Sequence, residues 1–180
     1  MHRTAPVAPC SRPATQPPVK LAVKPAPKLA RHAAEPEPSP VGCSSFKLRQ
    51  LSRRVSQHFD RIVGAAGLKT TQYSLLSHIV KLGPVRPGDL AAQMEMDAST
   101  LTRNLQPLVA QGWAEVGPGD DGRSRCVTAT DAGRAKRTEA QREWKRAQLA
   151  LNEQVGTARV ARLHALIDEC LAAMNDSLQA

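Results

Sequence analysis

Two stretches of this 180-residue chain decide its fold: residues 86–105 read RPGDLAAQMEMDASTLTRNL, and residues 119–133 read GDDGRSRCVTATDAG. The first predicts a helix that opens at Pro87, a tight turn, and a second helix capped by Asp97 or Ser99. The second predicts the tip and the returning strand of a β-hairpin, since a turn-rich segment is followed by strand-forming residues. Together they indicate a helix-turn-helix followed directly by a wing.

The second helix of this pair separates polar from apolar side chains. Leu101, Leu105 and Leu108 share one side and predict an anchor in the core. The opposite side carries groups that can hydrogen-bond to base edges or touch thymine methyl groups in the major groove of DNA. These residues are Ser99, Thr100, Thr102, Arg103, Asn104 and Gln106. An ordinary amphipathic surface helix is the alternative to a DNA-recognition helix. The features of the predicted hairpin distinguish between these two readings.

The predicted hairpin carries Arg123 and Arg125 near its tip. An arginine on such a wing can enter a narrow minor groove, where the potential of DNA is most negative. Asp121 can hold Arg123 through a charge-assisted hydrogen bond. A surface ion pair without a DNA partner is the alternative. The helix-turn-helix and the arginine-bearing wing together favour double-stranded DNA as the partner.

Periodic apolar residues predict further helices around this unit, which gives a mainly α fold with a small β-hairpin wing. The first helix begins at Ser44 or Ser45, either of which can cap it, and ends at Gly64. The strands of the hairpin are expected over residues 113–116 and 125–128. The other helices are expected over residues 70–82, 131–155 and 157–178. Thr130 is expected to cap the second of these, and Gly112 to end the helix that follows the tight turn.

The first and last helices carry apolar faces that must be covered. In the first, residues at three- and four-residue steps are expected to be buried: Leu48, Leu51, Val55, Phe59, Ile62 and Val63. In the last, a near-heptad stripe consists of Val160, Leu163, Ile167, Cys170, Met174 and Leu178. Burying a large aliphatic side chain contributes about 1.5–3 kcal/mol, so an exposed row is costly. Packing on the first helix of the same chain and self-association with a second chain can both cover the stripe, and we expect both.

The N-terminal 41 residues differ from the rest of the chain. This stretch is rich in proline, alanine and lysine, and it cannot bury enough apolar surface to offset the entropy lost on ordering. We therefore predict a disordered basic tail over residues 1–41 that can add phosphate contacts, with an extension of little function as the alternative. The rest divides into a dimerisation helix at 42–66, a winged helix-turn-helix at 67–133, and C-terminal dimerisation helices at 134–180.

Composition restricts the class of protein. The net charge of +9 and the pI of about 10.0 suit a polyanionic partner. We find no run of about 18 apolar residues and no secretory h-region, so we expect a cytoplasmic protein without a membrane partner. Cys10, Cys43, Cys126 and Cys170 stand far apart without a C-x-x-C pair, which favours free thiols over a disulfide framework or a metal site. We expect no cofactor and no catalytic residues.

From Leu48 to about Gly133 the chain resembles the MarR family of bacterial transcriptional regulators. Two positions depart from the family pattern: the wing has Gly122 where the family usually has arginine, and Ala129-Thr130 stand where it usually has Leu-Thr. The segments that carry the resemblance are, in chain order, GLKTTQYSLL (67–76), LAAQM (90–94), STLTR (99–103), QGW (111–113), DGRS (121–124) and ATDAG (129–133).

The resemblance implies a sequence-specific DNA-binding repressor. Two copies of the chain would form a homodimer and read a pseudo-palindromic operator, and a small ligand or thiol oxidation would release them. A ligand of phenolic or carboxylate type would bind between the dimerisation helices and the reading head, where Arg53, His58, Tyr73 and His78 are candidate contacts.

Cys43 is the candidate redox thiol, because the start of the first helix and nearby Lys47 would stabilise its thiolate. Peroxide-sensing members of the resembled family place their cysteine at the position of Ser45 and activate it with tyrosines on the first helix, which this chain lacks. An inert thiol is therefore the alternative reading of Cys43.

Two other classes of function compete with a DNA-binding regulator. A winged-helix protein-interaction module without specific DNA binding would lack clustered base-reading residues and a basic wing. A thiol-based enzyme would need a Cys/His/Asp pairing or a resolving C-x-x-C motif, and the sequence offers neither.

Overall fold

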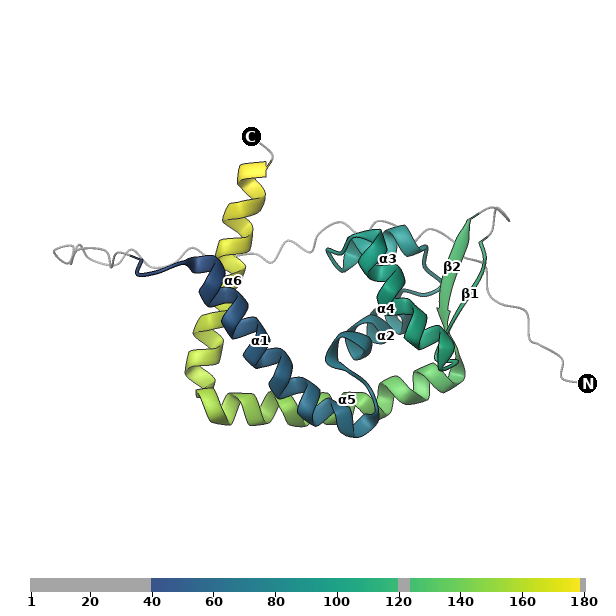
Figure 1. Cartoon of the computed structure of the whole chain (residues 1–180), viewed down its shortest axis with the longest axis horizontal. Helices are drawn as coiled ribbons and strands as arrows, with labels where there is room; N and C mark the ends of the chain where they lie inside the picture. The colour runs from purple at the N-terminus through teal and green to yellow at the C-terminus, as the bar shows by residue number, and fades with distance from the viewer. Residues whose placement is uncertain (1–39, 120–123, 179–180) are drawn as a thin grey trace, which may run out of the picture.

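The computed structural model describes residues 40–119 and 124–178. Figure 1 shows α5 along one edge of the molecule, with α2, α3, α4, β1 and β2 at one end and α6 rising at the other. We call the group from α2 to β2 the winged head. The elements are α1 (Ser44–Val63), the 3-10 turn η1 (Gly64–Ala66), α2 (Thr70–Leu82), α3 (Pro87–Gln93), α4 (Ala98–Ala110), β1 (Ala114–Pro118), β2 (Arg125–Ala129), α5 (Asp131–Val155) and α6 (Thr157–Leu178).

The hydrophobic core lies inside the winged head and at its junction with α1. Leu101, Leu105 and Leu108 are all buried, which confirms the predicted anchor of α4. The largest fully buried side chains are Val63, Leu68, Leu75, Leu76, Ile79, Val85, Leu90, Leu101, Leu108 and Val127. Because these residues come from α2, α3, α4 and β2, α4 is held in a fixed orientation.

The helix-turn-helix follows the sequence prediction closely. Pro87 occupies the first turn of α3, where its missing N–H costs nothing. The turn into α4 places Glu95 at φ +50°, a left-handed conformation, and the N–H of Met96 donates to the carbonyl of Ala91 at 2.9 Å. Asp97 then caps α4 by accepting from the N–H of Thr100, so Asp97 rather than Ser99 is the cap.

The C-terminal end of α4 moves the start of the first strand. Gly112 adopts φ +70° and its N–H donates to Val109, while the N–H of Trp113 reaches back to the carbonyl of Leu108 at 2.9 Å. This pair of bonds is a Schellman motif, and glycine permits the left-handed residue that it needs. Trp113 therefore belongs to the C-terminal cap of α4. We expected the first strand to begin at Trp113, but β1 begins at Ala114.

The wing is a two-stranded antiparallel hairpin whose register pairs Val116 with Val127 and Pro118 with Arg125. A further pair of backbone bonds ties it to the helix-turn-helix: Val85 and Val127 exchange N–H···O bonds of 3.1 and 2.8 Å. Because both valines are fully buried, this bridge fixes the wing against α2 and α3.

The start of α5 is locked to the base of the wing. Thr130 caps α5 by accepting from the N–H of Gly133 at 3.0 Å, and its hydroxyl donates to the carbonyl of Gly112 at 2.6 Å. The N–H of Thr130 donates to Trp113, whose ring lies 5.4 Å from the ammonium of Lys136. The predicted threonine cap is thus confirmed.

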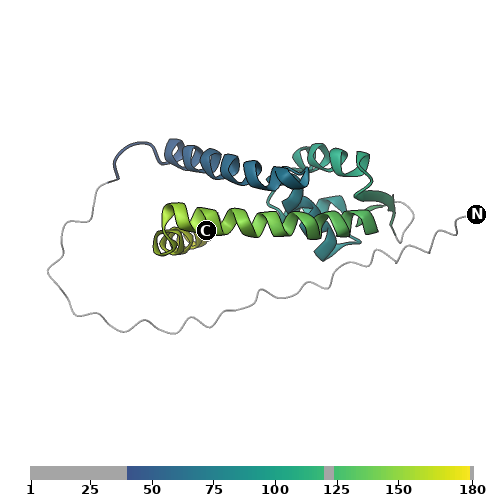
Figure 2. The same ribbon diagram turned by 90° about the horizontal axis from the view of Figure 1, so that it is seen from below.

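The apolar face of α1 is only half covered, which corrects the expectation that all of it is buried. Phe59 and Val63 are buried against α5, which runs beside α1 in Figure 2. Leu48 and Leu51 are 61% and 42% exposed. These two residues lie beyond the winged head, so the described part of the chain offers them too little apolar surface.

The stripe on α6 behaves in the same way. Val160 is 6% exposed and Leu163 is half-buried, so the stripe is covered only where α6 leaves α5. Farther along, Ile167 and Met174 of the stripe are 38% and 66% exposed, and Leu166 and Leu171, which flank it, are 57% and 49% exposed. Only a small part of the expected packing within one chain is therefore present.

Candidate nucleic-acid interface

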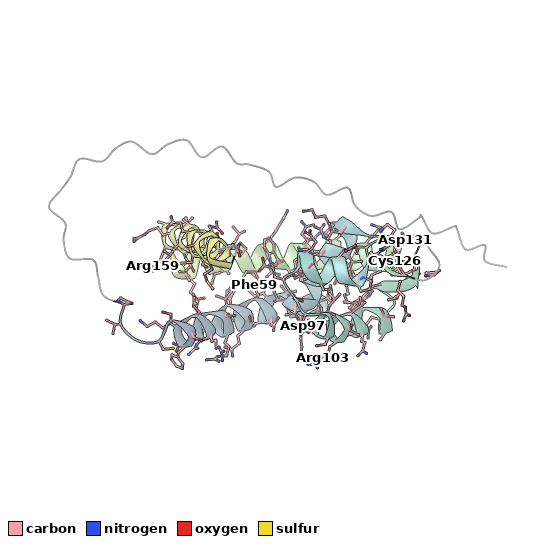
Figure 3. The ribbon with its side chains drawn as sticks, turned by 90° about the horizontal axis from the view of Figure 1, so that it is seen from above. Phe59, Asp97, Arg103, Cys126, Asp131 and Arg159 are labelled. Carbon is pink, nitrogen blue, oxygen red and sulfur yellow. The ribbon has the colours of Figure 1, made fainter. Side chains whose placement is uncertain are left out.

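The predicted base-reading residues of α4 fall into two groups. Arg103 and Gln106 lie on the outermost side of the helix with the hydroxyl residues Ser99 and Thr102, and all four are exposed. Thr100 and Asn104 are half-buried, because the helical repeat of about 3.6 residues turns them toward the flank. Figure 3 shows Asp97 and Arg103 on α4 at the edge of the winged head, far from Arg159 on α6.

Asp97 organises the first turn of α4. Its Oδ1 accepts from Ser99 Oγ at 2.6 Å and from the backbone N–H of Thr100 at 2.7 Å. Its Oδ2 accepts from Thr100 Oγ1 at 2.7 Å. The hydroxyl of Thr102 donates to the carbonyl of Ala98 at 2.8 Å. The side chains at the leading end of α4 are therefore fixed before any partner arrives.

These bonds also keep Asp97 ionised. The Ser99 hydroxyl, followed by the N–H and hydroxyl of Thr100, holds the pKa of the Asp97 carboxyl well below its ordinary value. Asp97 is fully exposed. The leading end of α4 thus carries a negative charge and hydroxyl lone pairs, while Arg103 carries a positive charge about two turns farther on.

The wing presents one of the two predicted arginines within the described residues. Arg125 is exposed and lies at the end of the paired strands, opposite Pro118. Arg123 and its predicted partner Asp121 lie outside the described residues. The hairpin leads toward the segment that contains Arg123, because Gly119 donates its N–H to the carbonyl of Ser124 at 2.7 Å.

Two of the predicted effector contacts meet in an aromatic cluster between α1, α2 and α5. His58 is buried, and its Nε2 lies 2.9 Å from the carbonyl of Ala147, so this nitrogen carries the proton and donates. Trp144 lies between Phe59 and Tyr73, with ring centroids 6.3 and 6.2 Å away. Trp144 was not predicted from the sequence. It lies between the buried Ala140 and Ala147, on the face of α5 that packs against the core.

The other two predicted effector contacts lie elsewhere. Arg53 is exposed on α1. His78 is half-buried on α2, where its Nδ1 donates to the carbonyl of Ser74 at 2.8 Å. The structure therefore brings together only His58 and Tyr73 of the four residues.

The cysteines differ in their environments. Cys43 is exposed and free, and it occupies the N-cap position of α1 without a side-chain capping bond, so neither Ser44 nor Ser45 is the cap. Cys170 is also exposed and free. Cys126 is buried on β2 and is disulfide-bonded, which contradicts the expectation of a free thiol there. Spacing along the chain cannot show which cysteines meet in space.

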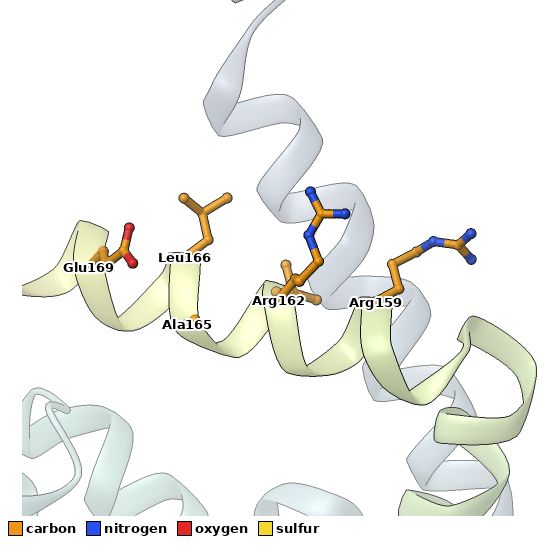
Figure 4. Close-up of a pocket in the computed structure, with 6 residues that line it drawn as sticks. Arg159, Arg162, Ala165, Leu166 and Glu169 are labelled. Carbon is orange, nitrogen blue, oxygen red and sulfur yellow. The ribbon is translucent and has the colours of Figure 1, made fainter. Parts of the chain in front are cut away.

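An open pocket of about 500 Å³ lies on α6. Figure 4 shows its side chains projecting from successive turns of the helix, with α1 passing behind. All of its lining residues belong to α6: Arg159, Arg162, Leu163, Ala165, Leu166 and Glu169. The pocket is a notch in the same exposed surface as the apolar stripe, and it contains none of the predicted effector contacts.

Two further searches apply to the described ranges only. Within residues 40–119 and 124–178, no group of three or more histidine, cysteine or acidic residues is placed to hold a metal ion. No helix in these ranges is both long and apolar enough to cross a membrane.

Comparisons with known proteins identify what this geometry resembles. A model of the MarR family matches residues 66–124, which include all of the helix-turn-helix and β1. The DNA complex of the Mycobacterium tuberculosis transcriptional regulator MosR is 31% identical over 74% of this chain and 98% of that one, with a TM-score of 0.62. A mutant of Escherichia coli MarR complexed with operator DNA, at 21% identity, shares the fold over 71% of this chain and 92% of its own, with a TM-score of 0.64.

A curated relative matches a shorter region. The HTH-type transcriptional regulator YwoH of Bacillus subtilis is 25% identical over 90 residues, which are 50% of this chain and 66% of that protein.

Proposed function

Because the chain belongs to the MarR family of DNA-binding transcriptional regulators, we propose that it is a repressor that binds a pseudo-palindromic operator as a homodimer. The family consists of regulators rather than enzymes.

The observation that carries the proposal is the large apolar surface on α1 and α6. Two members of the α1 face, Leu48 and Leu51, are 61% and 42% exposed, and Phe46, on another side of the same helix, is 60% exposed. The α6 stripe and the notch of about 500 Å³ lie on the neighbouring helix. Exposed apolar surface of this kind on a single chain indicates a site of protein–protein contact. A second copy of the chain offers a matching surface through two-fold symmetry.

Dimerisation would place two winged heads so that both can bind one DNA duplex. Two recognition helices related by a two-fold axis bind half-sites about one helical turn of DNA apart, or a multiple of it. In each head, Arg103 and Gln106 would meet base edges together with Ser99 and Thr102, while the half-buried Thr100 and Asn104 would contribute from the flank. Arg123 and Arg125 would reach the neighbouring minor groove. That the MosR relative was crystallised with DNA supports this mode of binding.

The division of the chain follows from the same proposal. Residues 42–66 and 134–180 would form the dimerisation region, and residues 67–133 would form the DNA-reading region. The predicted basic tail over residues 1–41 falls almost entirely outside the described residues, so its role stays a prediction.

A small ligand or thiol oxidation would act by changing the distance between the two heads. A ligand releases a repressor only if it binds the DNA-incompetent arrangement more tightly than the competent one. His58 on α1 and Tyr73 on α2 both lie against α5, where a phenolic or carboxylate ligand would have this effect. Oxidation of the exposed Cys43 is the alternative trigger, since it lies at the start of α1.

The test combines the oligomeric state with DNA binding. Sedimentation velocity of the full chain should give a dimer, and selection from a random DNA library should enrich a sequence with two inverted half-sites. The affinity for this sequence should fall steeply with salt, because phosphate contacts release counterions. A monomeric chain, or binding without any sequence preference, would contradict the proposal. The second result would favour the protein-interaction module.

Expression from a reporter placed behind the selected sequence then tests the direction of regulation. Repression predicts lower expression with the protein than without it. Recovery on adding salicylate would support a ligand of the phenolic carboxylate type, whereas recovery only with a mild peroxide, lost in Cys43→Ser, would assign the trigger to the thiol.

A further inference from the structure

The first turn of α4 has a hydrogen-bond pattern that limits what its hydroxyl groups can offer to DNA. Ser99 Oγ and Thr100 Oγ1 lie 2.6 and 2.7 Å from the two carboxylate oxygens of Asp97. Thr102 Oγ1 lies 2.8 Å from the carbonyl oxygen of Ala98. An ionised carboxylate and a carbonyl can only accept, so each hydroxyl must direct its single proton into the helix.

Toward DNA these hydroxyls therefore present only lone pairs. The groups that donate in the major groove are the N4 amino group of cytosine and the N6 amino group of adenine, whereas guanine O6 and N7 accept. Phosphate oxygens also accept. A hydroxyl without an available proton can pair with the amino groups alone. Ser99 is the one of these hydroxyls that both depends on Asp97 and is exposed beside Arg103.

Starting from the proposed operator binding, we propose that Asp97 is a specificity-determining residue of the reading face. It holds the Ser99 hydroxyl in an accepting state, so that Ser99 pairs with an amino group of adenine or cytosine. Asp97 acts through Ser99 and is a positioning residue, while Ser99 touches the base. Arg103 supplies donors only, so the two ends of the exposed face read opposite kinds of base edge.

The competing role for Asp97 is that of a simple helix cap, and glycine separates the two roles. Glycine at an N-cap position costs a helix little stability relative to aspartate. In Asp97→Gly, Ser99 Oγ loses its acceptor, so the serine proton is free to point outward; asparagine would not free it, because Ser99 Oγ and the N–H of Thr100 bond the same oxygen, Oδ1. Ser99→Ala removes the hydroxyl and keeps the bonds between Asp97 and Thr100.

Two control variants complete the set. Glu153→Gln removes one exposed carboxylate charge from the far half of α5, so it reports what a change of charge does alone. Arg103→Ala removes the donating end of the face and leaves the bonds of Asp97 intact. Far-ultraviolet circular dichroism and thermal melts confirm that each variant keeps its helices.

The experiment uses the full chain and the sequence that it enriches from a random library. Each adenine of a half-site is replaced in turn by purine, which lacks the N6 amino group, and each cytosine by pyrimidin-2-one, which lacks the N4 amino group. Fluorescence anisotropy at one salt concentration gives the affinity of every protein for every duplex.

We expect at least one position where loss of the amino group weakens the wild-type chain about tenfold, as for one lost base-specific hydrogen bond. The same replacement should weaken Asp97→Gly and Ser99→Ala by less than about twofold. Glu153→Gln and Arg103→Ala should keep the wild-type penalty at this position, although Arg103→Ala binds more weakly overall.

Several outcomes would overturn the inference. An enriched sequence without any amino-dependent position would remove it and leave the proposed function standing. A penalty that stays the same in Asp97→Gly would reduce Asp97 to a cap, and one that persists in Ser99→Ala would show that Ser99 does not contact the base. If no sequence is enriched, the proposed function fails, and this inference fails with it.

Discussion

Gly133 offers a sharp test of how α5 is joined to the wing. A Cβ at this position would overlap the carbonyl oxygen of Trp113 and lie 2.8 Å from its carbonyl carbon. Two carbon atoms are best placed at about 3.5 Å or more, so the first turn of α5 would have to retreat by at least about 0.7 Å. The retreat strains the cap, in which Gly133 donates to Thr130 at 3.0 Å and Thr130 donates to Trp113 at 3.2 Å.

Gly133→Ala should therefore lower the free energy of unfolding by about 2–4 kcal/mol, of which overpacking contributes about 1–3 kcal/mol and weakened hydrogen bonds the rest. Gly64→Ala is the matched control. Gly64 has φ −57° and nothing within 4 Å of an added Cβ. Gly64→Ala should raise the free energy of unfolding by about 0.4–1 kcal/mol, because alanine restricts the conformations of the unfolded chain.

The measurement is urea unfolding of both variants at one protomer concentration, since the stability of a dimer depends on concentration. Opposite signs for the two variants are the expected result. A Gly133→Ala protein that is as stable as the wild type would show that α5 does not approach Trp113 as closely as described.

Three further predictions follow from the same structure. Arg103→Ala should weaken binding to the selected operator about ten- to hundredfold in fluorescence anisotropy, and an unchanged affinity would remove Arg103 from the interface. Met174→Glu places a charge on the exposed α6 stripe and should give a monomer in sedimentation velocity, whereas Val109→Glu on the winged head should stay dimeric. The pKa of Asp97 lies below its ordinary value, so its ionised form stabilises the fold above about pH 4 and this contribution is lost as the pH falls further. Urea titrations between about pH 6 and pH 3 should therefore show a larger loss of stability for the wild type than for Asp97→Asn.

The sequence predicted the parts of the fold that local chemistry controls. Pro87, Asp97 and Thr130 mark helix starts because each has a local bonding role that few other residues can fill. Gly112 marks a helix end because it tolerates a left-handed conformation. These signals lie within a few residues of the effect that they cause, so single-sequence reasoning can detect them.

What escaped prediction depends on residues that are distant in sequence. The pairing of Val85 with Val127 and the contacts of Trp144 with Phe59 exist only once α2, α5 and the wing have packed. The buried and bonded state of Cys126 has the same origin. The partial burial of α1 was missed because periodicity reports that a face is apolar, but not how much of it the same chain can cover.

The candidate site also has features that the sequence predicted and features that it did not. The exposed face of α4 followed from the spacing of Leu101, Leu105 and Leu108. The direction of the Ser99 proton did not, because it depends on which of two possible caps accepts the first N–H. Four residues were predicted as effector contacts. The sequence could not show that His58 and Tyr73 belong to one aromatic cluster while Arg53 and His78 lie elsewhere.

The uninterrupted length of α5 has a mechanical consequence. Its 25 residues span about 37 Å, at about 1.5 Å per residue, from the base of the wing to the start of α6. A rod of this length that pivots by about 5° at one end moves its other end by roughly 3 Å, close to the rise of one base-pair step, about 3.4 Å. A tilt too small to disturb any packed layer would therefore shift a head out of register with its half-site. Under the proposed operator binding, α5 would act as a lever arm, and small movements where α1 packs on α5 would change the affinity for the operator.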